Sequence, residues 1–166
     1  MIVIGIDPGT ATTGYGIIEE DPAGRLSVIT YGTILTDSCE TIEKRLQIIY
    51  QEISIIINLH RPDSGAVEKL YFQKNVTNAI AVGQARGVLL LALANAGIRV
   101  AEYTPNEVKQ SVSGYGAADK KQVQQMVKTV LNLLEIPKPD DAADALAVAI
   151  CHLHSVGYKR LVQNGD

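Results

Sequence analysis

The first eighteen residues, MIVIGIDPGTATTGYGII, constrain the fold more than any other stretch of the chain. The apolar run over residues 2–6 predicts a strand buried on both faces, and Asp7 follows at its C-terminal end. A carboxylate beside such a strand is costly to bury unless something pairs with it. Pro8 and Gly9 turn the chain, and residues 14–18 predict a returning strand. Either Asp7 only accepts hydrogen bonds from the turn, or it belongs to a functional site.

The length of 166 residues predicts one domain with a core of its own. Aliphatic side chains must build that core, because the chain has one Phe and no Trp. Two cysteines, Cys39 and Cys151, are too few for a disulfide framework. The apolar start lacks a basic region and contains Asp7, so it does not resemble a signal peptide. Apolar runs such as residues 88–94 are too short to span a bilayer. We therefore expect a cytoplasmic protein with no membrane partner.

Basic residues gather in the middle of the chain. The total charge is −3, which by itself disfavours a nucleic-acid-binding protein. Residues 69–128, however, hold eight basic and three acidic residues, a local balance of +5 that leaves −8 for the rest. Because a local basic face matters more than the total charge, this distribution favours a nucleic-acid partner.

The order of the predicted elements indicates a mixed β-sheet. Three strands form a meander, strands and helices then alternate, and helices follow, which implies an α/β fold with a five-stranded mixed sheet flanked by helices on both faces. The predicted strands cover residues 2–7, 14–18, 26–35, 65–68 and 98–101, and the predicted helices cover 41–59, 78–95, 105–113, 120–134 and 140–156. We expect one domain over 1–156 and a flexible tail over 157–166.

Acidic residues end two of these strands. Asp7 follows the first strand, and Glu68 ends the strand that a helical crossover should place beside it and parallel to it. Both carboxylates would then emerge at the sheet edge where open α/β sheets bind ligands.

The last helix adds two more acids, Asp141 and Asp144, which share one face with small apolar residues. Capping of the helix N-terminus explains Asp140 and, in part, Asp141, but it does not explain Asp144. Four converging carboxylates would repel one another, and a pair of divalent ions would remove the repulsion. An all-oxygen ligand set suits Mg²⁺ or Mn²⁺, and two such ions promote phosphoryl displacement.

Five short motifs, in this order, closely resemble the RuvC family of Holliday junction resolvases. They run from the first strand through the last helix: IGIDPG at 4–9, VE at 67–68 just before an aromatic pair, VGQARG at 82–87, VKQ at 108–110 and DAADALA at 141–147. Each motif is weak alone, but the ordered set is specific.

The resemblance implies a ribonuclease H-like fold, a homodimer and Mg²⁺-dependent cleavage of four-way DNA junctions in recombination and repair. It implies two Mg²⁺ per active site, for which Mn²⁺ can substitute, and contact with a branch-migration motor. The family's four catalytic, metal-binding acids fall on Asp7, Glu68, Asp141 and Asp144, and none of them is replaced.

The resemblance also places functional lysines at Lys109 and Lys120, the latter as a catalytic residue. Lys120 opens a helix, where its charge opposes the helix dipole, yet a helix N-terminus with lysines also forms a phosphate site. Gly114 and Gly116 would let Lys120 move toward the scissile phosphate. We interpret Lys121 as a solvated surface lysine.

An aromatic residue of the polar loop after Glu68 is a further candidate for DNA contact. Tyr71 matches the family's base-contacting aromatic, and an exposed ring can stack on splayed bases. Alternatively, Tyr71 or Phe72 anchors the loop on the core. Lys74 and Arg86, from the basic region, complete the predicted DNA-binding residues.

The helix over 78–95 is apolar on more faces than one core can use, and it contains several small residues. We predict that it forms a homodimer interface, which suits a substrate with two equivalent strands to cut. The alternative is a central core helix covered by its own chain.

Three other functions remain open. The turn Asp7-Pro8-Gly9-Thr10 also resembles the phosphate loop of actin-like ATPases and sugar kinases, but the chain has no room for their second lobe. A pre-ribosomal RNA nuclease of the same superfold typically lacks Glu68 with its aromatic loop. A non-enzymatic junction-binding module would use the acids structurally, and activity with and without Mg²⁺ would distinguish it.

Overall fold

The computed structural model describes residues 1–69 and 76–163 and contains a five-stranded mixed sheet. The strands lie in the order β3-β2-β1-β4-β5. β1 pairs with β2 and β2 with β3 in antiparallel fashion, whereas the β1–β4 and β4–β5 pairs are parallel. The strands are β1 Ile2–Asp7, β2 Thr12–Glu20, β3 Leu26–Leu35, β4 Ser64–Glu68 and β5 Arg99–Tyr103. The predicted meander and the predicted parallel crossover are both confirmed.

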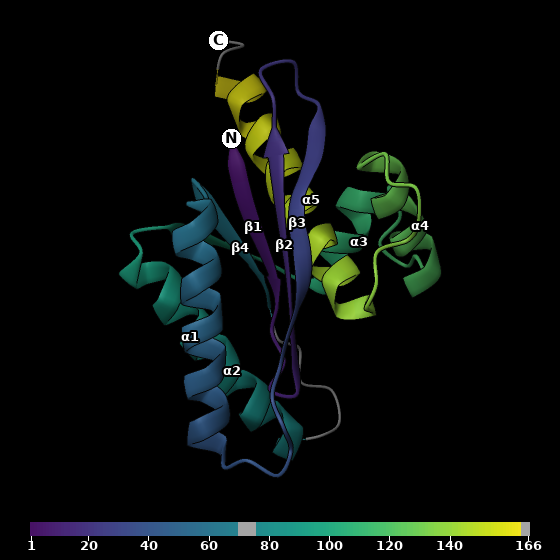
Figure 1. The fold of residues 1–166 in the computed structure, drawn as a ribbon. Helices are drawn as coiled ribbons and strands as arrows, with labels where there is room; N and C mark the ends of the chain where they lie inside the picture. The colour runs from purple at the N-terminus through teal and green to yellow at the C-terminus, as the bar shows by residue number, and fades with distance from the viewer. Residues whose placement is uncertain (70–75, 164–166) are drawn as a thin grey trace.

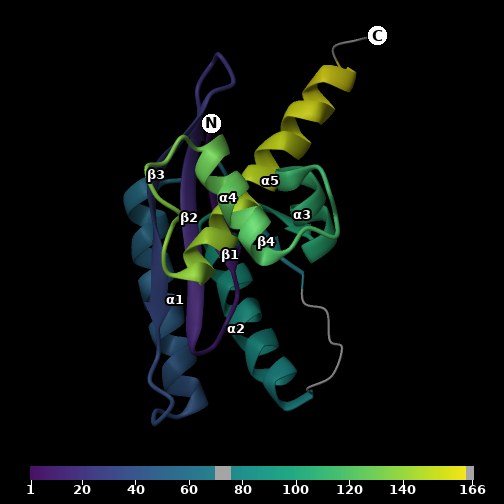
Figure 2. The ribbon, with the colours of Figure 1, turned by 90° about the vertical axis from the view of Figure 1, so that its right-hand side faces the viewer.

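Helices cover both faces of this sheet, as predicted (Figures 1 and 2). Two of them, α1 (Ile42–His60) and α2 (Val76–Asn95), lie on one face, and α3, α4 and α5 lie on the other. The last three helices span Pro105–Ser113, Lys120–Val130 and Asp140–Gln163. None of the helices in the described residues is both long and apolar enough to cross a bilayer.

The alternation along β1 explains why its apolar run is continuous. Val3 packs into the core between the sheet and α5, whereas Ile4 and Ile6 pack into the core between the sheet and α1 and α2. Successive strand residues point to opposite faces, so Asp7 points to the α5 side. The alternation along β1 therefore directs the Asp7 carboxylate toward α5.

Glycines in β1 and β2 allow α5 to lie directly on the sheet. A Cβ atom at Gly5 would collide with the backbone carbonyl of Ala145, and one at Gly14 would collide with that of Asp141. Gly14 is paired with Asp7 in the sheet. The missing side chain therefore brings the first turn of α5 beside the end of β1.

Several predicted boundaries are wrong, each for a local reason. Helix α4 ends at Val130 rather than 134, because the chain turns at Asn132, which has a φ of 50°. Strand β5 begins at Arg99 rather than 98, since the Ile98 amide still bonds the Leu93 carbonyl as part of the α2 C-cap.

Helix α5 continues to Gln163, seven residues beyond the predicted end at 156. Tyr158, Leu161 and Val162 recur at helical spacing beyond Gly157, where the prediction ended the helix too early. In the structure residues 157–163 are helical, although we had predicted that they belong to a flexible tail. The division into a domain over 1–156 and a flexible tail stays a prediction.

Candidate active site

The ends of β1 and β4 place two carboxylates side by side. The strands are parallel, and Ile6 is in register with Val67, so Asp7 and Glu68 each follow the same paired position. Asp7 is partly buried, and so is Glu68. The predicted convergence at the C-terminal edge of the sheet is confirmed for this pair.

Helix α5 brings the other two acids to the same edge. Its first turn contains Asp140 and Asp141, where carboxylates interact favourably with the helix dipole. Asp144 lies one turn further on, with 32% of its side chain exposed, and its neighbour Ala145 is fully buried. The dipole accounts for the first-turn acids, but Asp144 faces the carboxylates of β1 and β4, whose pKa values it raises through its charge.

Burial and mutual repulsion raise the pKa values of three of these carboxyl groups, those of Asp7, Glu68 and Asp144. Burial, followed by the charges of Glu68, Asp144 and Asp141, raises the pKa of Asp7 to about 8. Burial and the charge of Asp144 raise the pKa of Glu68 to about 7. Burial also raises the pKa of Asp144, against the opposing effect of Lys120. The site therefore has an excess of negative charge that cations would stabilise.

Lys120 is the cation nearest to this excess charge in the described structure. Its Nζ lies 2.9 Å from Oδ2 of Asp144 and 3.4 Å from Oδ2 of Asp140. Burial alone would lower the pKa of Lys120, but these two carboxylates raise it above its usual value. Their charges offset the unfavourable position of a lysine at a helix N-terminus.

The N-terminus of α4 is already capped by its own residues. The Asp119 carboxylate accepts a hydrogen bond from the Gln122 amide, and the Gln122 side chain accepts one from the Asp119 amide. This cap occupies the Gln122 amide, and the phosphate site that we expected at the helix N-terminus stays a prediction. Lys120 reaches the acids through its side chain, independently of this cap.

Lys109 joins the same group of side chains. It lines a cavity of about 260 Å³ together with Glu68, Lys120 and Asp144, and its charge opposes the rise in the pKa of Glu68. The structure thus brings together Asp7, Glu68, Asp141, Asp144, Lys109 and Lys120, the acids and lysines singled out from the sequence.

The family model for the crossover junction endodeoxyribonuclease RuvC matches residues 3–152. This chain belongs to the RuvC family. Among curated RuvC proteins, that of Syntrophomonas wolfei is 57% identical over 93% of this chain and 90% of its own length. The RuvC of Desulforamulus reducens is 58% identical over 92% of this chain and 93% of its own length.

Solved structures agree with the RuvC assignment. Thermus thermophilus RuvC in complex with a Holliday junction substrate matches with a TM-score of 0.87 at 32% identity, covering 95% of this chain and 96% of that one. The yeast mitochondrial Holliday junction resolvase Ydc2 shares the fold alone, with a TM-score of 0.71 at 11% identity, covering 98% and 81% of the two chains. The ribonuclease H-like fold implied by the sequence resemblance is confirmed.

The donor set of this RuvC-family site fits hard divalent cations. All four acids are oxygen ligands, as Mg²⁺ and Mn²⁺ prefer. In the described part of the chain, no three carboxylate, His or Cys side chains form a group already arranged to hold a metal ion. Lys120 instead holds Asp144. Metal binding would therefore need small rearrangements of these side chains.

The structure leaves the other DNA-binding predictions untested. Tyr71 and Lys74 lie outside the described residues. Arg86, on α2, forms an ion pair of 2.7 Å with Glu102 of β5. Glu102 is in register with Val67, which packs on the α1–α2 side, so this pair lies on the face opposite the carboxylates.

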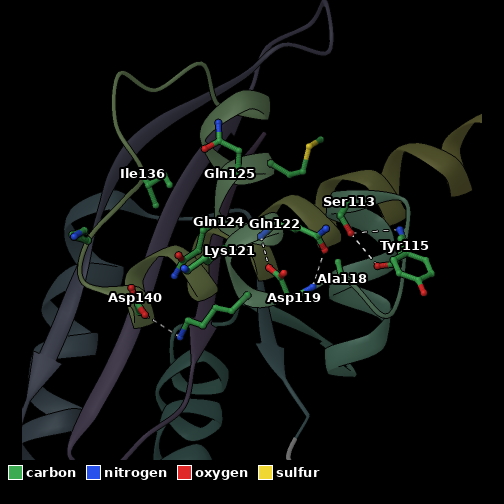
Figure 3. Close-up of a pocket in the computed structure, with 13 residues that line it drawn as sticks. Ser113, Tyr115, Ala118, Asp119, Lys121, Gln122, Gln124, Gln125, Ile136 and Asp140 are labelled. Atoms are coloured by element: carbon green, nitrogen blue, oxygen red, sulfur yellow. Dashed lines mark hydrogen bonds and ion pairs between the residues drawn. The ribbon is translucent and has the colours of Figure 1, made fainter.

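A broad cavity of about 1020 Å³ beside the site was not predicted. It borders Lys120 and Asp140 and extends along α4, where Lys121 and Gln124 line it opposite Tyr115 (Figure 3). Lys121 is exposed, as expected. The pairing of Lys120 with Asp140 was also missed, because nothing in the sequence relates the start of α4 to that of α5.

Proposed function

We propose that this protein is an endonuclease that resolves four-way DNA junctions by paired hydrolytic cuts during recombination and repair. The convergence of the four acids with Lys109 and Lys120 at one sheet edge carries the proposal. Family membership and the likeness to a RuvC bound to a Holliday junction support the choice of substrate.

We infer that the site works with Mg²⁺, two ions per active site, for which Mn²⁺ can substitute. The carboxylate oxygens of Asp7, Glu68, Asp141 and Asp144 would hold the ions. When bound, such ions supply activation of the attacking water and stabilisation of the leaving oxygen. The raised pKa values of Asp7 and Glu68 mean that ligation releases protons from these two acids near neutral pH.

Lys120 and Lys109 have separate tasks in this scheme. Lys120 is held by Asp144 in the free protein and would exchange this partner for a phosphate oxygen of the bound strand. There its charge would stabilise the negative charge that develops during displacement. Lys109, beside Glu68, would add a second positive charge on the phosphate. Tyr71, Lys74 and Arg86 remain proposed DNA contacts outside this cluster.

We further propose a homodimer formed through α2. Ile80, Gln84, Gly87 and Leu91 are exposed and recur at intervals of four, three and four, so they form one stripe along the helix. A Cβ atom at Gly87 would meet open space, which leaves room for a partner helix. A two-fold dimer would present two active sites to the two equivalent strands of a junction.

We propose action in the cytoplasm and contact with a branch-migration motor, which would deliver junctions to the dimer.

A cleavage assay tests the proposed function. Labelled mobile four-way junctions and linear duplexes of the same sequence would be incubated with the protein in Mg²⁺ or EDTA, and the cuts mapped on each strand. We expect paired, ligatable nicks on opposite strands of the junction, in Mg²⁺ alone, with the linear duplex left intact. Junction binding without cleavage in either Mg²⁺ or Mn²⁺ would indicate a non-enzymatic junction-binding module.

A further inference from the structure

A third pocket lies behind the turn that follows Asp7. It has a volume of about 410 Å³ and is bounded by the β1–β2 turn at Gly9 and Thr10, by Arg45 of α1 and by Ala81 of α2. Asp141 also lines it, so the pocket meets the active site at one of the four acids. Neither the sequence nor the proposed chemistry assigns it a role.

Arg45 is held in this pocket by only one of its nitrogens. Its Nε donates a hydrogen bond of 2.8 Å to Thr36 Oγ1, and the Thr36 hydroxyl donates one of 2.6 Å to the Thr10 carbonyl. Hydrogen bonding from Cys39 is the main cause of the lowered pKa of Asp37, and the charge of Arg45 adds to it, but Arg45 and Asp37 form no ion pair among the described residues. The terminal guanidinium nitrogens, which carry four of the five donor hydrogens, make no protein hydrogen bond within residues 1–69 and 76–163.

Thr10 adds an unused polar group to the same pocket. The residue is 5% exposed, and its Oγ1 is buried without a hydrogen-bond partner. Thr13, at the start of β2, shows the ordinary arrangement, in which the hydroxyl donates to the Gly9 carbonyl at 2.6 Å. A buried hydroxyl without a partner is unfavourable, which indicates that a ligand satisfies it.

The chemistry of these groups selects an oxyanion. A guanidinium offers a planar fork of donors that matches two phosphate oxygens, and the threonine hydroxyl can donate to a third. Asp141 repels an anion, so the ligand would lie toward Arg45 and away from the carboxylates. A nucleic-acid strand carries phosphates at regular intervals, so two phosphates of one strand could occupy the active site and this pocket at the same time.

We propose that the pocket binds a backbone phosphate of the DNA strand next to the scissile phosphate, with Arg45 and Thr10 as the binding residues. This inference rests on the proposed function. The pocket would hold the strand on the far side of Asp141, and two fixed phosphates set the direction of the strand through the site. Arg45 is thus a positioning residue and Lys120 a catalytic one.

Junctions that carry one neutral methylphosphonate at a time test this proposal against two variants. Arg45→Gln removes the charge, and Lys44→Gln removes the neighbouring charge on the exposed side of α1 as a matched control. We expect Arg45→Gln to weaken junction binding roughly tenfold in EDTA and to lower the slope of log K against log salt by about 0.9. Lys44→Gln should leave both unchanged.

The methylphosphonate scan then locates the contact. At one position near the cut, a methylphosphonate should weaken junction binding by wild type as much as Arg45→Gln does. The same methylphosphonate should not weaken junction binding by Arg45→Gln any further. Thr10→Val should lose part of the junction affinity that Arg45→Gln loses, whereas Thr10→Ser should keep the wild-type affinity. Thermal melting of each variant identifies a misfolded one, and Thr10→Val with the scan decides the matter if Arg45→Gln does not fold.

If the methylphosphonate and Arg45→Gln lowered junction affinity additively at every position, the proposal would be overturned. Equal losses of junction affinity in Arg45→Gln and Lys44→Gln would also overturn it. Inorganic phosphate alone, titrated against the NMR signal of the Arg45 Nε–H, tests for a free-anion site. Binding of inorganic phosphate together with additive losses on DNA would assign the pocket to a free anion and overturn its role on the strand. A wild-type protein that neither binds nor cuts junctions would instead refute the proposed function.

Discussion

Lys120 Nζ lies 2.9 Å from Oδ2 of Asp144, so the first residue of α4 is tied to the buried face of α5. Oδ2 of Asp140, the second carboxylate that Lys120 contacts, lies 3.4 Å away, and Asp140 is exposed. The ammonium therefore offsets part of the charge of the four acids while no DNA is bound. The proposed move of Lys120 to a phosphate would break this contact.

Replacing Lys120 by Ala should slow junction cleavage by roughly 100-fold, because a charge that stabilises the transition state is removed. Binding should weaken by less than about fivefold, because one phosphate contact among many contributes little to affinity. Single-turnover cleavage and filter binding measure the two quantities, with Lys121→Ala as the matched neighbour. Equal losses in both would make Lys120 a plain binding residue.

The metal-free protein should lose stability as pH rises. Asp7 and Glu68 have folded-state pKa values of about 8 and about 7, above their usual values of 3.8 and 4.5. Between about pH 4 and pH 8 these two groups therefore hold more protons in the folded than in the unfolded state, so their contribution to the free energy of unfolding is largest below about pH 4 and falls until about pH 8. Thermal melts in EDTA across this range test the direction.

Asp7→Asn should reduce the loss of stability at high pH, because the asparagine amide carries no charge that would repel Glu68 and Asp144. At pH 8 in EDTA we expect Asp7→Asn to melt higher than wild type, by roughly 2–4 °C for each 1 kcal/mol gained. Glu19→Gln, exposed on β2, serves as the control for loss of an acid. A lower melting temperature for Asp7→Asn at pH 8 would contradict the repulsion.

Local signals made the sheet predictable. The apolar run over 2–6 and the turn at Pro8 and Gly9 each act within a few residues, and the strands that they predict are present as β1 and β2. Helix ends were harder, because the end of α4 depends on the positive φ of Asn132 and α5 continues through Gly157, a residue type that usually weakens a helix.

The acids of the site were predictable for a different reason. Each is anomalous where it stands, at the end of a buried strand or on an apolar helix face, and topology alone brings the strand ends together. The partner of Lys120 and the pocket at Arg45 were not predictable, because both depend on contacts between elements that are distant in sequence. Such contacts leave no spacing pattern to recognise.

Gly14→Ala should damage both folding and cleavage. The added Cβ would collide with the Asp141 carbonyl, so the first turn of α5 must move away from β2. We expect a destabilisation of about 1–3 kcal/mol, as for overpacked cores, and cleavage reduced more than junction binding. Gly157→Ala, where a Cβ meets nothing within 4 Å, should be neutral or slightly stabilising. Denaturant melts and cleavage rates compare the two, and equal stability would contradict close packing at Gly14.

A charge on the exposed stripe of α2 should separate the proposed dimer. Leu91 is 54% exposed, and Leu91→Glu would place a carboxylate in the interface. Sedimentation should show a wild-type dimer and a Leu91→Glu monomer that has lost paired cutting. Leu134→Glu, at a leucine that is 95% exposed in the loop before α5, should stay dimeric. A wild-type monomer at micromolar concentration that cuts in pairs would contradict the dimer.

The most direct test of the four-acid site measures cleavage and binding of the same junction by wild type and by Asp7→Asn. Asparagine keeps the shape of the side chain but removes a charge at the centre of the cluster. The account predicts Mg²⁺-dependent paired cutting by wild type, no detectable cutting by Asp7→Asn, and junction affinities that agree within about threefold, because Asp7 contacts no phosphate in the proposed complex. Metal-dependent cutting by Asp7→Asn at the wild-type rate would contradict it.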